Sequence, residues 1–125
     1  MKRADKILVI GAMGDTGRKI TELLRYKYGK TQVIATDLLK PARVKSDNQP
    51  YFRLDVFNKA RLLMLVRDEG VTQIYLMATM FSADEEQNPQ MSWNLNMDGL
   101  LNVLDISVKC NIEKVVWPSC QAHFS

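Results

Sequence analysis

Three glycines, Gly11, Gly14 and Gly17, stand in the segment VIGAMGDTGRKI, directly after the apolar run of residues 6–10. That run has the pattern of a strand buried on both faces, and a helical pattern follows the glycines. In this context the first glycine permits a tight turn, the second lets a diphosphate approach the backbone, and the third lets the helix pack against the strand. Unpaired amides at the start of the helix attract phosphate groups. The expected cofactor-binding residues of this segment are the three glycines together with Met13, Asp15 and Thr16.

Asp37 stands at the end of the second predicted strand, residues 32–37, and follows the last of these glycines by about 20 residues, as the dinucleotide-binding pattern requires. A carboxylate there accepts hydrogen bonds from both ribose hydroxyls of NAD and repels the 2′-phosphate of NADP. The sequence therefore predicts an NAD site that includes Asp37 and its neighbour Leu38. Two alternatives stay open: the glycines form a merely structural turn, or the nearby Lys40 and Arg43 favour NADP.

Strand-like and helix-like patterns alternate along the chain, which is typical of a parallel sheet with helices on both faces. The predicted strands are residues 6–10, 32–37, 51–56, 72–78 and 113–119, and the predicted helices begin near Asp15, after Asn58, and at residue 89, the last running to 109. We expect an α/β fold of the Rossmann type, a doubly wound parallel sheet with strand order 3-2-1-4-5 and flanking helices. Its ligand crevice should lie at the carboxyl ends of the strands. Residues 1–125 then form one domain, with a loop over residues 38–50.

The first helix is predicted in more detail. Asp15 and Thr16 offer an N-cap region where the helix begins. Ile20, Leu23 and Leu24 are spaced so that they should share one face of the helix. We therefore expect an amphipathic helix with these three side chains on its apolar face.

Composition and charge exclude several functional classes. With 46% hydrophobic and 25% charged residues, the chain has the composition of an ordinary globular domain. The net charge of +3 is small and the basic residues are scattered, which disfavours a nucleic-acid surface. No apolar stretch is long enough to span a bilayer. Cys110, Cys120 and the single histidine, His123, lack metal-ligand spacing. We expect a cytoplasmic protein that binds no metal, nucleic acid or membrane.

Four segments carry a family resemblance: GAMGDTG, RLDV at 53–56, YLMAT at 75–79 and NLNMDGLLNVLD at 94–105. With these the chain resembles the extended short-chain dehydrogenase/reductase superfamily, whose members include sugar-nucleotide epimerases and dehydratases. The resemblance implies that RLDV holds the adenine, that YLMAT runs along the cofactor, and that an asparagine of the helix supports the active-site backbone. The residues so implied at the cofactor are Asp55, Val56, Met77, Ala78, Thr79 and Asn96.

Residues 75–119 are more narrowly similar to the short-chain-type L-threonine 3-dehydrogenases, which oxidise the threonine hydroxyl with NAD to 2-amino-3-oxobutanoate. This similarity implies that Ser82 and Ser119 lie on the substrate side. It also puts Cys120 at the position of the catalytic hydroxyl, where a thiol is the poorer hydrogen-bond donor. The alternative for Cys120 is a small, partly buried residue after a strand.

The superfamily's acid/base pair, Tyr-x-x-x-Lys on the helix after the fifth strand, has no counterpart in these 125 residues. Tyr26 and Lys30 have the right spacing but end the first helix, where a solvated helix end is expected. The resemblance thus implies an NAD-binding domain truncated before the substrate lobe and inactive alone. In intact relatives the partner is a small-molecule substrate.

Two other functions remain open: a non-catalytic NAD-binding or dimerising module, and a fragment of a nucleotide-sugar epimerase or dehydratase. The predicted helix of residues 89–109 bears on the first, because it is apolar nearly all round. Such a helix has a second face to bury, and in the superfamily the corresponding helix pairs across a dimer. A homodimer through residues 89–109 is therefore expected. The alternative is that a further part of the protein covers this face.

Overall fold

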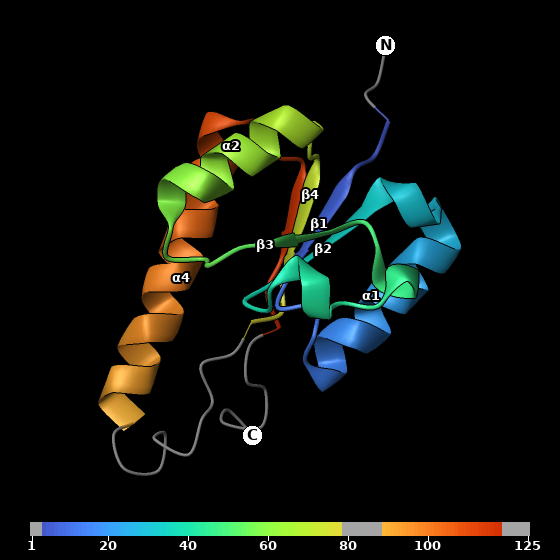
Figure 1. Cartoon of the computed structure of the whole chain (residues 1–125). Coiled ribbons are helices and arrows are strands. Elements are labelled where there is room, and N and C mark those ends of the chain that lie inside the picture. Colours follow the sequence, from blue (N-terminus) through green and yellow to red (C-terminus); the bar gives the residue numbers. More distant parts are fainter. Residues whose placement is uncertain (1–3, 79–88, 119–125) are drawn as a thin grey trace.

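The computed structural model describes residues 4–78 and 89–118, with backbone alone for residues 89 and 91–95. Its five parallel strands are β1 (Ile7–Ile10), β2 (Val33–Asp37), β3 (Tyr51–Arg53), β4 (Gln73–Leu76) and β5 (Lys114–Val116). They form one sheet in the order β3-β2-β1-β4-β5, which confirms the predicted topology. Helix α1 (Asp15–Tyr28) covers one face, and α2 (Lys59–Glu69) and α4 (Pro89–Lys109) cover the other (Figure 1). The chain connections run outward from β1 in one direction to β2 and β3 and in the other direction to β4 and β5, so the topological switch point lies between β1 and β4.

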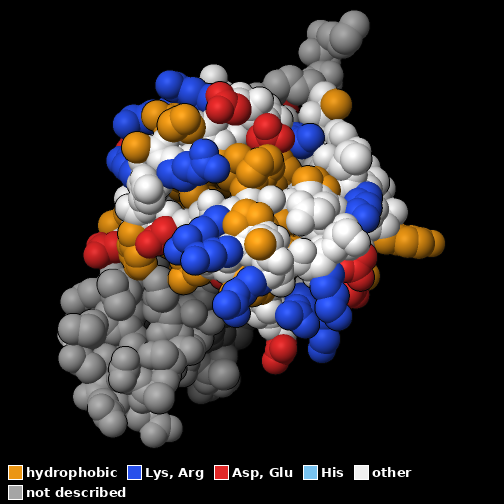
Figure 2. Space-filling view, in the orientation of Figure 1, with side chains coloured by type: hydrophobic (Ala, Val, Ile, Leu, Met, Phe, Trp, Pro, Cys, Tyr) orange, Lys and Arg blue, Asp and Glu red, His pale blue; other side chains and the backbone are white. Residues whose placement is uncertain are grey.

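Strand β1 divides the core between these two layers. Leu8 and Ile10 pack on the side of α2 and α4, whereas Ile7 and Val9 pack on the side of α1. All four side chains are buried, as the continuous apolar run of residues 6–10 predicts for a central strand covered on both faces. Figure 2 shows one face of the molecule, where basic, acidic and apolar side chains are interspersed.

All five strands are shorter in the structure than predicted. Strand β3 ends at Arg53 rather than residue 56, because Asp55 closes a turn: its Oδ1 accepts from the Phe57 amide at 2.9 Å and its carbonyl from the Asn58 amide at 2.9 Å. Strand β5 covers Lys114–Val116 within the predicted residues 113–119.

The predicted loop of residues 38–50 is in part helical. It contains the short 3₁₀ helices η2 (Pro41–Arg43) and η3 (Ser46–Asn48), and a third, η1 (Lys30–Gln32), leads into β2. Such single turns form easily wherever three residues can close a local hydrogen bond. The cap expected for α2 is confirmed, since Asn58 Oδ1 accepts from the Arg61 amide at 3.1 Å.

The prediction for α1 was wrong in two respects. The helix begins at Asp15 with Gly14 as its N-cap, so Asp15 and Thr16 are not the cap, and no side chain caps this end. Leu23 is 64% exposed, whereas Leu24 is buried. The buried face instead runs through Gly17, Thr21 and Leu24. Thr21 can lie there because its hydroxyl donates to the carbonyl of residue 17 at 2.6 Å.

Candidate functional site

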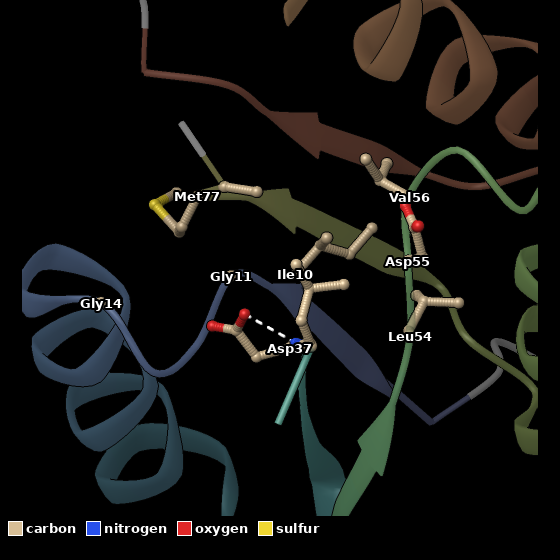
Figure 3. Close-up of a pocket in the computed structure, with 10 residues that line it drawn as sticks. Ile10, Gly11, Gly14, Asp37, Leu54, Asp55, Val56 and Met77 are labelled. Atoms are coloured by element: carbon tan, nitrogen blue, oxygen red, sulfur yellow. Dashed lines mark hydrogen bonds between the residues drawn. The ribbon is translucent and has the colours of Figure 1, made fainter. Parts of the chain in front are cut away.

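A cavity of about 340 Å³ lies at the carboxyl ends of β1, β2 and β4 and beside the segment after β3 (Figure 3). This is the crevice at the switch point where open parallel sheets bind their ligands. Eight residues predicted for the cofactor site line it: Gly11, Gly14, Asp37, Leu38, Asp55, Val56, Met77 and Ala78. Two further lining residues, Ile10 and Leu54, were not predicted. Both are apolar strand or strand-end residues, and nothing in their type marked them out.

The loop between β1 and α1 is anchored to the end of β2. The amides of Gly11 and Ala12 both donate to the carbonyl of Thr36 at 2.9 Å, and the Met13 amide donates to Asp37 Oδ2 at 2.8 Å. Thr36 is fully buried, and its own hydroxyl donates to the Val9 carbonyl at 2.8 Å. The sequence analysis did not single out Thr36, because its role depends on a main-chain carbonyl that any residue carries.

The next four amides, those of residues 14–17, have no hydrogen-bond acceptor within the described residues. They are the amides that every α-helix leaves unpaired at its first turn, and the positive end of the helix dipole lies there. Gly14 itself is exposed and lines the cavity. The start of α1 therefore presents unsatisfied donors at a cavity that a phosphate group could enter.

The three glycines of this loop differ in why they lack a side chain. Gly11 has a φ of +86°, and a Cβ there would collide with the backbone of Ala78. A Cβ on Gly17 would collide with the Gly11 carbonyl oxygen and Ala12. Both glycines are therefore required by the fold itself.

Gly14 is required by neither its conformation nor its packing. Its φ of −74° and ψ of 168° are open to any residue. Apart from its two chain neighbours, the nearest atom of the described residues to a Cβ there would be the Gly11 carbonyl oxygen, at 3.9 Å. A side chain at Gly14 would enter space beside the unpaired amides. This free space fits a diphosphate brought close to the backbone.

Asp37 lies at the end of β2 with its carboxylate beside the glycine loop (Figure 3). Oδ2 accepts from the Met13 amide and Oδ1 from the Leu38 amide, each at 2.8 Å. A carboxylate has about four acceptor positions, so each oxygen keeps one for a hydroxyl group. The residue is therefore suited to receive the two hydroxyls of a ribose.

The opposite wall of the cavity is apolar except for Asp55, and α4 holds it in place. Asn102 Nδ2 donates to the Val56 carbonyl at 3.1 Å. A Cβ on Gly99, in the same helix, would be 3.3 Å from the Val56 side chain. Asn102 was missed by the sequence analysis, although an amide within an apolar helix was an available signal. The apolar side chains that line the cavity here are Leu38, Leu54 and Val56, a composition that suits a purine.

No tyrosine is among the described residues that line this cavity. The Tyr51 hydroxyl donates to the Leu39 carbonyl at 2.7 Å. Burial raises the pKa of Tyr51, and the Asp37 charge raises it further. A catalytic tyrosine needs the opposite change, so Tyr51 is a structural residue. Tyr26, which shares the Tyr-x-x-x-Lys spacing with Lys30, is 93% exposed on α1.

The remaining predicted site residues divide into two groups. Asn96 is half-buried on α4, and Asp15 and Thr16 are exposed in the first turn of α1. The others lie outside the described residues: Thr79, Ser82, Ser119 and Cys120. In the part that the structure describes, no three acidic, cysteine or histidine residues gather as a metal site would require. No helix of that part is long and apolar enough to cross a membrane.

A parallel sheet in this order, with a glycine loop at its switch point, defines the Rossmann-type class of dinucleotide-binding folds. Within that class, the chain belongs to the NAD dependent epimerase/dehydratase family, whose sequence profile matches residues 7–125.

Known relatives agree with this assignment. An uncharacterised epimerase/dehydratase of Staphylococcus aureus (strain USA300) is 38% identical over 108 residues, which are 86% of this chain and 34% of the relative. The holo form of a GalE-like L-threonine dehydrogenase from Cupriavidus necator superposes with a TM-score of 0.83 at 38% identity, over 91% of this chain and 36% of that one. A UDP-glucose 4-epimerase of Thermus thermophilus in complex with NAD gives a TM-score of 0.73 at 27% identity, over 90% of this chain and 36% of that one. The chain thus spans about a third of the length of its relatives.

Proposed function

We propose that this chain is the NAD-binding region of an oxidoreductase that resembles L-threonine 3-dehydrogenase. The observation that supports the proposal is Gly14, where neither the backbone conformation nor the packing requires a glycine and where a side chain would occupy the space proposed for the ligand. The amides of residues 14–17 would hold the diphosphate, and Asp37 the adenosine ribose. The apolar wall that includes Val56 would hold the adenine, with Met77 and Ala78 along the cofactor.

When bound, NAD supplies the hydride acceptor, and the residues of this chain bind and orient it. In the proposed reaction a hydride leaves C3 of threonine for the nicotinamide while a base takes the hydroxyl proton. We expect the 125 residues by themselves to bind NAD without oxidising threonine. Their Tyr-x-x-x-Lys spacing, Tyr26 and Lys30, ends the first helix and not a helix after the fifth strand. Ser82, Ser119 and Cys120 remain the predicted substrate-side residues. A cytoplasmic location and a small-molecule substrate likewise stay predictions.

A nucleotide-sugar epimerase or dehydratase is the second candidate, supported by the epimerase similarity described above. The threonine enzyme is favoured because its likeness is stronger, with 38% identity against 27%. A third candidate, a module that binds NAD or dimerises without catalysis, shares the cofactor site and differs only in the chemistry of the whole protein.

Calorimetric titration tests the cofactor proposal directly. We expect saturable binding of NAD to the folded chain, with NADP weaker by about tenfold or more, because the 2′-phosphate would approach the Asp37 carboxylate. Asp37→Ala should lessen this preference. Equal or tighter binding of NADP would show that Lys40 and Arg43 decide the choice. A folded chain that binds neither nucleotide would contradict the proposal.

We further propose that α4 pairs with a second copy of itself. Leu101, Leu104 and Val108 are 56%, 42% and 80% exposed and follow one another along one side of the helix; we call them the α4 stripe. Asp98 and Lys109 stand toward opposite ends of this stripe. Antiparallel pairing about Leu104 would bring each of these charges beside its opposite on the other copy.

Sedimentation velocity tests this pairing. Leu101→Asp combined with Val108→Asp should convert a dimer to a folded monomer, because both side chains face solvent in the single chain. Met64→Asp is the matched control, since Met64 is 54% exposed and belongs to α2 rather than to the α4 stripe. A wild-type chain that stays monomeric at about 100 μM, or a dimer that survives the double change, would refute the pairing.

A further inference from the structure

The structure gives the Asp37 carboxylate a second task beside its proposed contact with ribose. Three successive amides of the glycine loop donate to the end of β2, but they do so through different groups. Those of Gly11 and Ala12 use the Thr36 main-chain carbonyl, whereas that of Met13 uses the Asp37 side chain. The third anchor of the loop is therefore the only one of these that depends on the type of residue present.

The position of this anchor matters because the Met13 amide immediately precedes the unpaired amides of residues 14–17. The chain enters α1 directly after Met13. A hydrogen bond that fixes the Met13 amide therefore restricts the directions in which the following free amides point. The carboxylate is itself fixed on both sides, with Oδ1 on the Leu38 amide and Oδ2 on the Met13 amide, each at 2.8 Å. It also stands directly after the fully buried Thr36.

We propose that Asp37 is a positioning residue for the diphosphate half of the cofactor site. It holds the glycine loop in its binding conformation through the Met13 amide, and so it strengthens the binding even of a ligand that has no ribose hydroxyls. The inference rests on the proposed NAD site and adds a role that ribose recognition alone does not contain.

Two substitutions separate the hydrogen bond from the charge. Asp37→Ala and Asp37→Asn both remove the negative charge, which by itself would favour an incoming phosphate. Only Asp37→Asn keeps an oxygen that can accept from the Met13 amide. The Leu38 amide, which lies at an exposed position, can turn to water in either variant. The difference between the two variants therefore reports the anchor.

The probe is 2′,3′-dideoxyadenosine 5′-diphosphate, which carries the diphosphate but neither ribose hydroxyl. We expect calorimetry to show that Asp37→Ala binds it about tenfold more weakly than Asp37→Asn, the effect of about one hydrogen bond. In the ligand-free chain, hydrogen exchange of the Met13 amide should be at least about tenfold faster in Asp37→Ala than in Asp37→Asn, because the alanine variant leaves that amide without its acceptor.

Equal affinities for this probe in the two variants, together with equal Met13 exchange, would overturn the inference and restrict Asp37 to the ribose. A failure of the proposed function gives a different result. In that case the wild-type chain binds neither ADP nor NAD. The exchange experiment needs no ligand, so it still decides whether Asp37 anchors the loop in that event.

Discussion

Gly17→Ala is expected to lower the free energy of unfolding by about 2 kcal/mol or more. The new Cβ would collide with the carbonyl oxygen of Gly11 and lie 3.0 Å from the Ala12 Cα. Both of those residues are tied to Thr36 by hydrogen bonds of 2.9 Å, so the loop cannot move aside without breaking them. Overpacking costs about 1–3 kcal/mol in a core and reaches the upper part of that range against backbone, while alanine returns at most about 1 kcal/mol of helix propensity.

Urea unfolding followed by circular dichroism measures this loss, with Gly14→Ser as the matched control in the same loop. Beyond its chain neighbours, a Cβ at Gly14 meets no atom of the described residues closer than 3.9 Å, so the control should unfold at or above the wild-type midpoint. A Gly17→Ala variant with the wild-type midpoint would mean that α1 is free to shift away from the loop. The close contact between α1 and the end of β1 would then not be a requirement of the fold.

The sheet order and the glycine loop could be predicted from the sequence because both depend on local patterns. Apolar runs bounded by helical patterns indicate parallel strands, and Asp37 is recognisable by its distance along the chain from the glycines. The hydrogen bond from Met13 to Asp37 could not be predicted in this way. It follows from the register that pairs Ile10 with Thr36, which becomes known only when β1 and β2 are placed side by side.

The errors have similar physical causes. Leu23 was placed on one face with Ile20 and Leu24 because of its spacing, whereas the buried face of α1 uses Gly17 and Thr21 with Leu24. Thr21 can be buried only because its hydroxyl finds a main-chain acceptor within the helix. Asn102 and the Val56 carbonyl lie 46 positions apart, so no local pattern links them. In each case a polar or small residue takes its role from a partner that the linear pattern does not reveal.

Gly14→Ser is expected to weaken NAD binding by about 10- to 100-fold and to leave stability unchanged or a few tenths of a kcal/mol higher. Gly14 is the N-cap of α1, with extended dihedral angles that serine adopts readily. The serine hydroxyl would accept from an amide two or three residues later, which takes one donor away from the diphosphate. The side chain would also fill the space beside the remaining amides. Loss of one hydrogen bond to a charged group, about 1.5–3 kcal/mol, corresponds to the expected change in affinity.

Calorimetry with NAD and urea unfolding on the same preparation test this pair of effects together. Natural helices prefer serine to glycine at an N-cap only slightly, so stability alone does not explain which residue stands there. If Gly14→Ser binds NAD as tightly as the wild type, the free amides of α1 do not hold the diphosphate, and the cofactor site must be assigned elsewhere. If affinity falls while stability holds, Gly14 is a position where the chain forgoes a helix cap so that its backbone can meet a ligand.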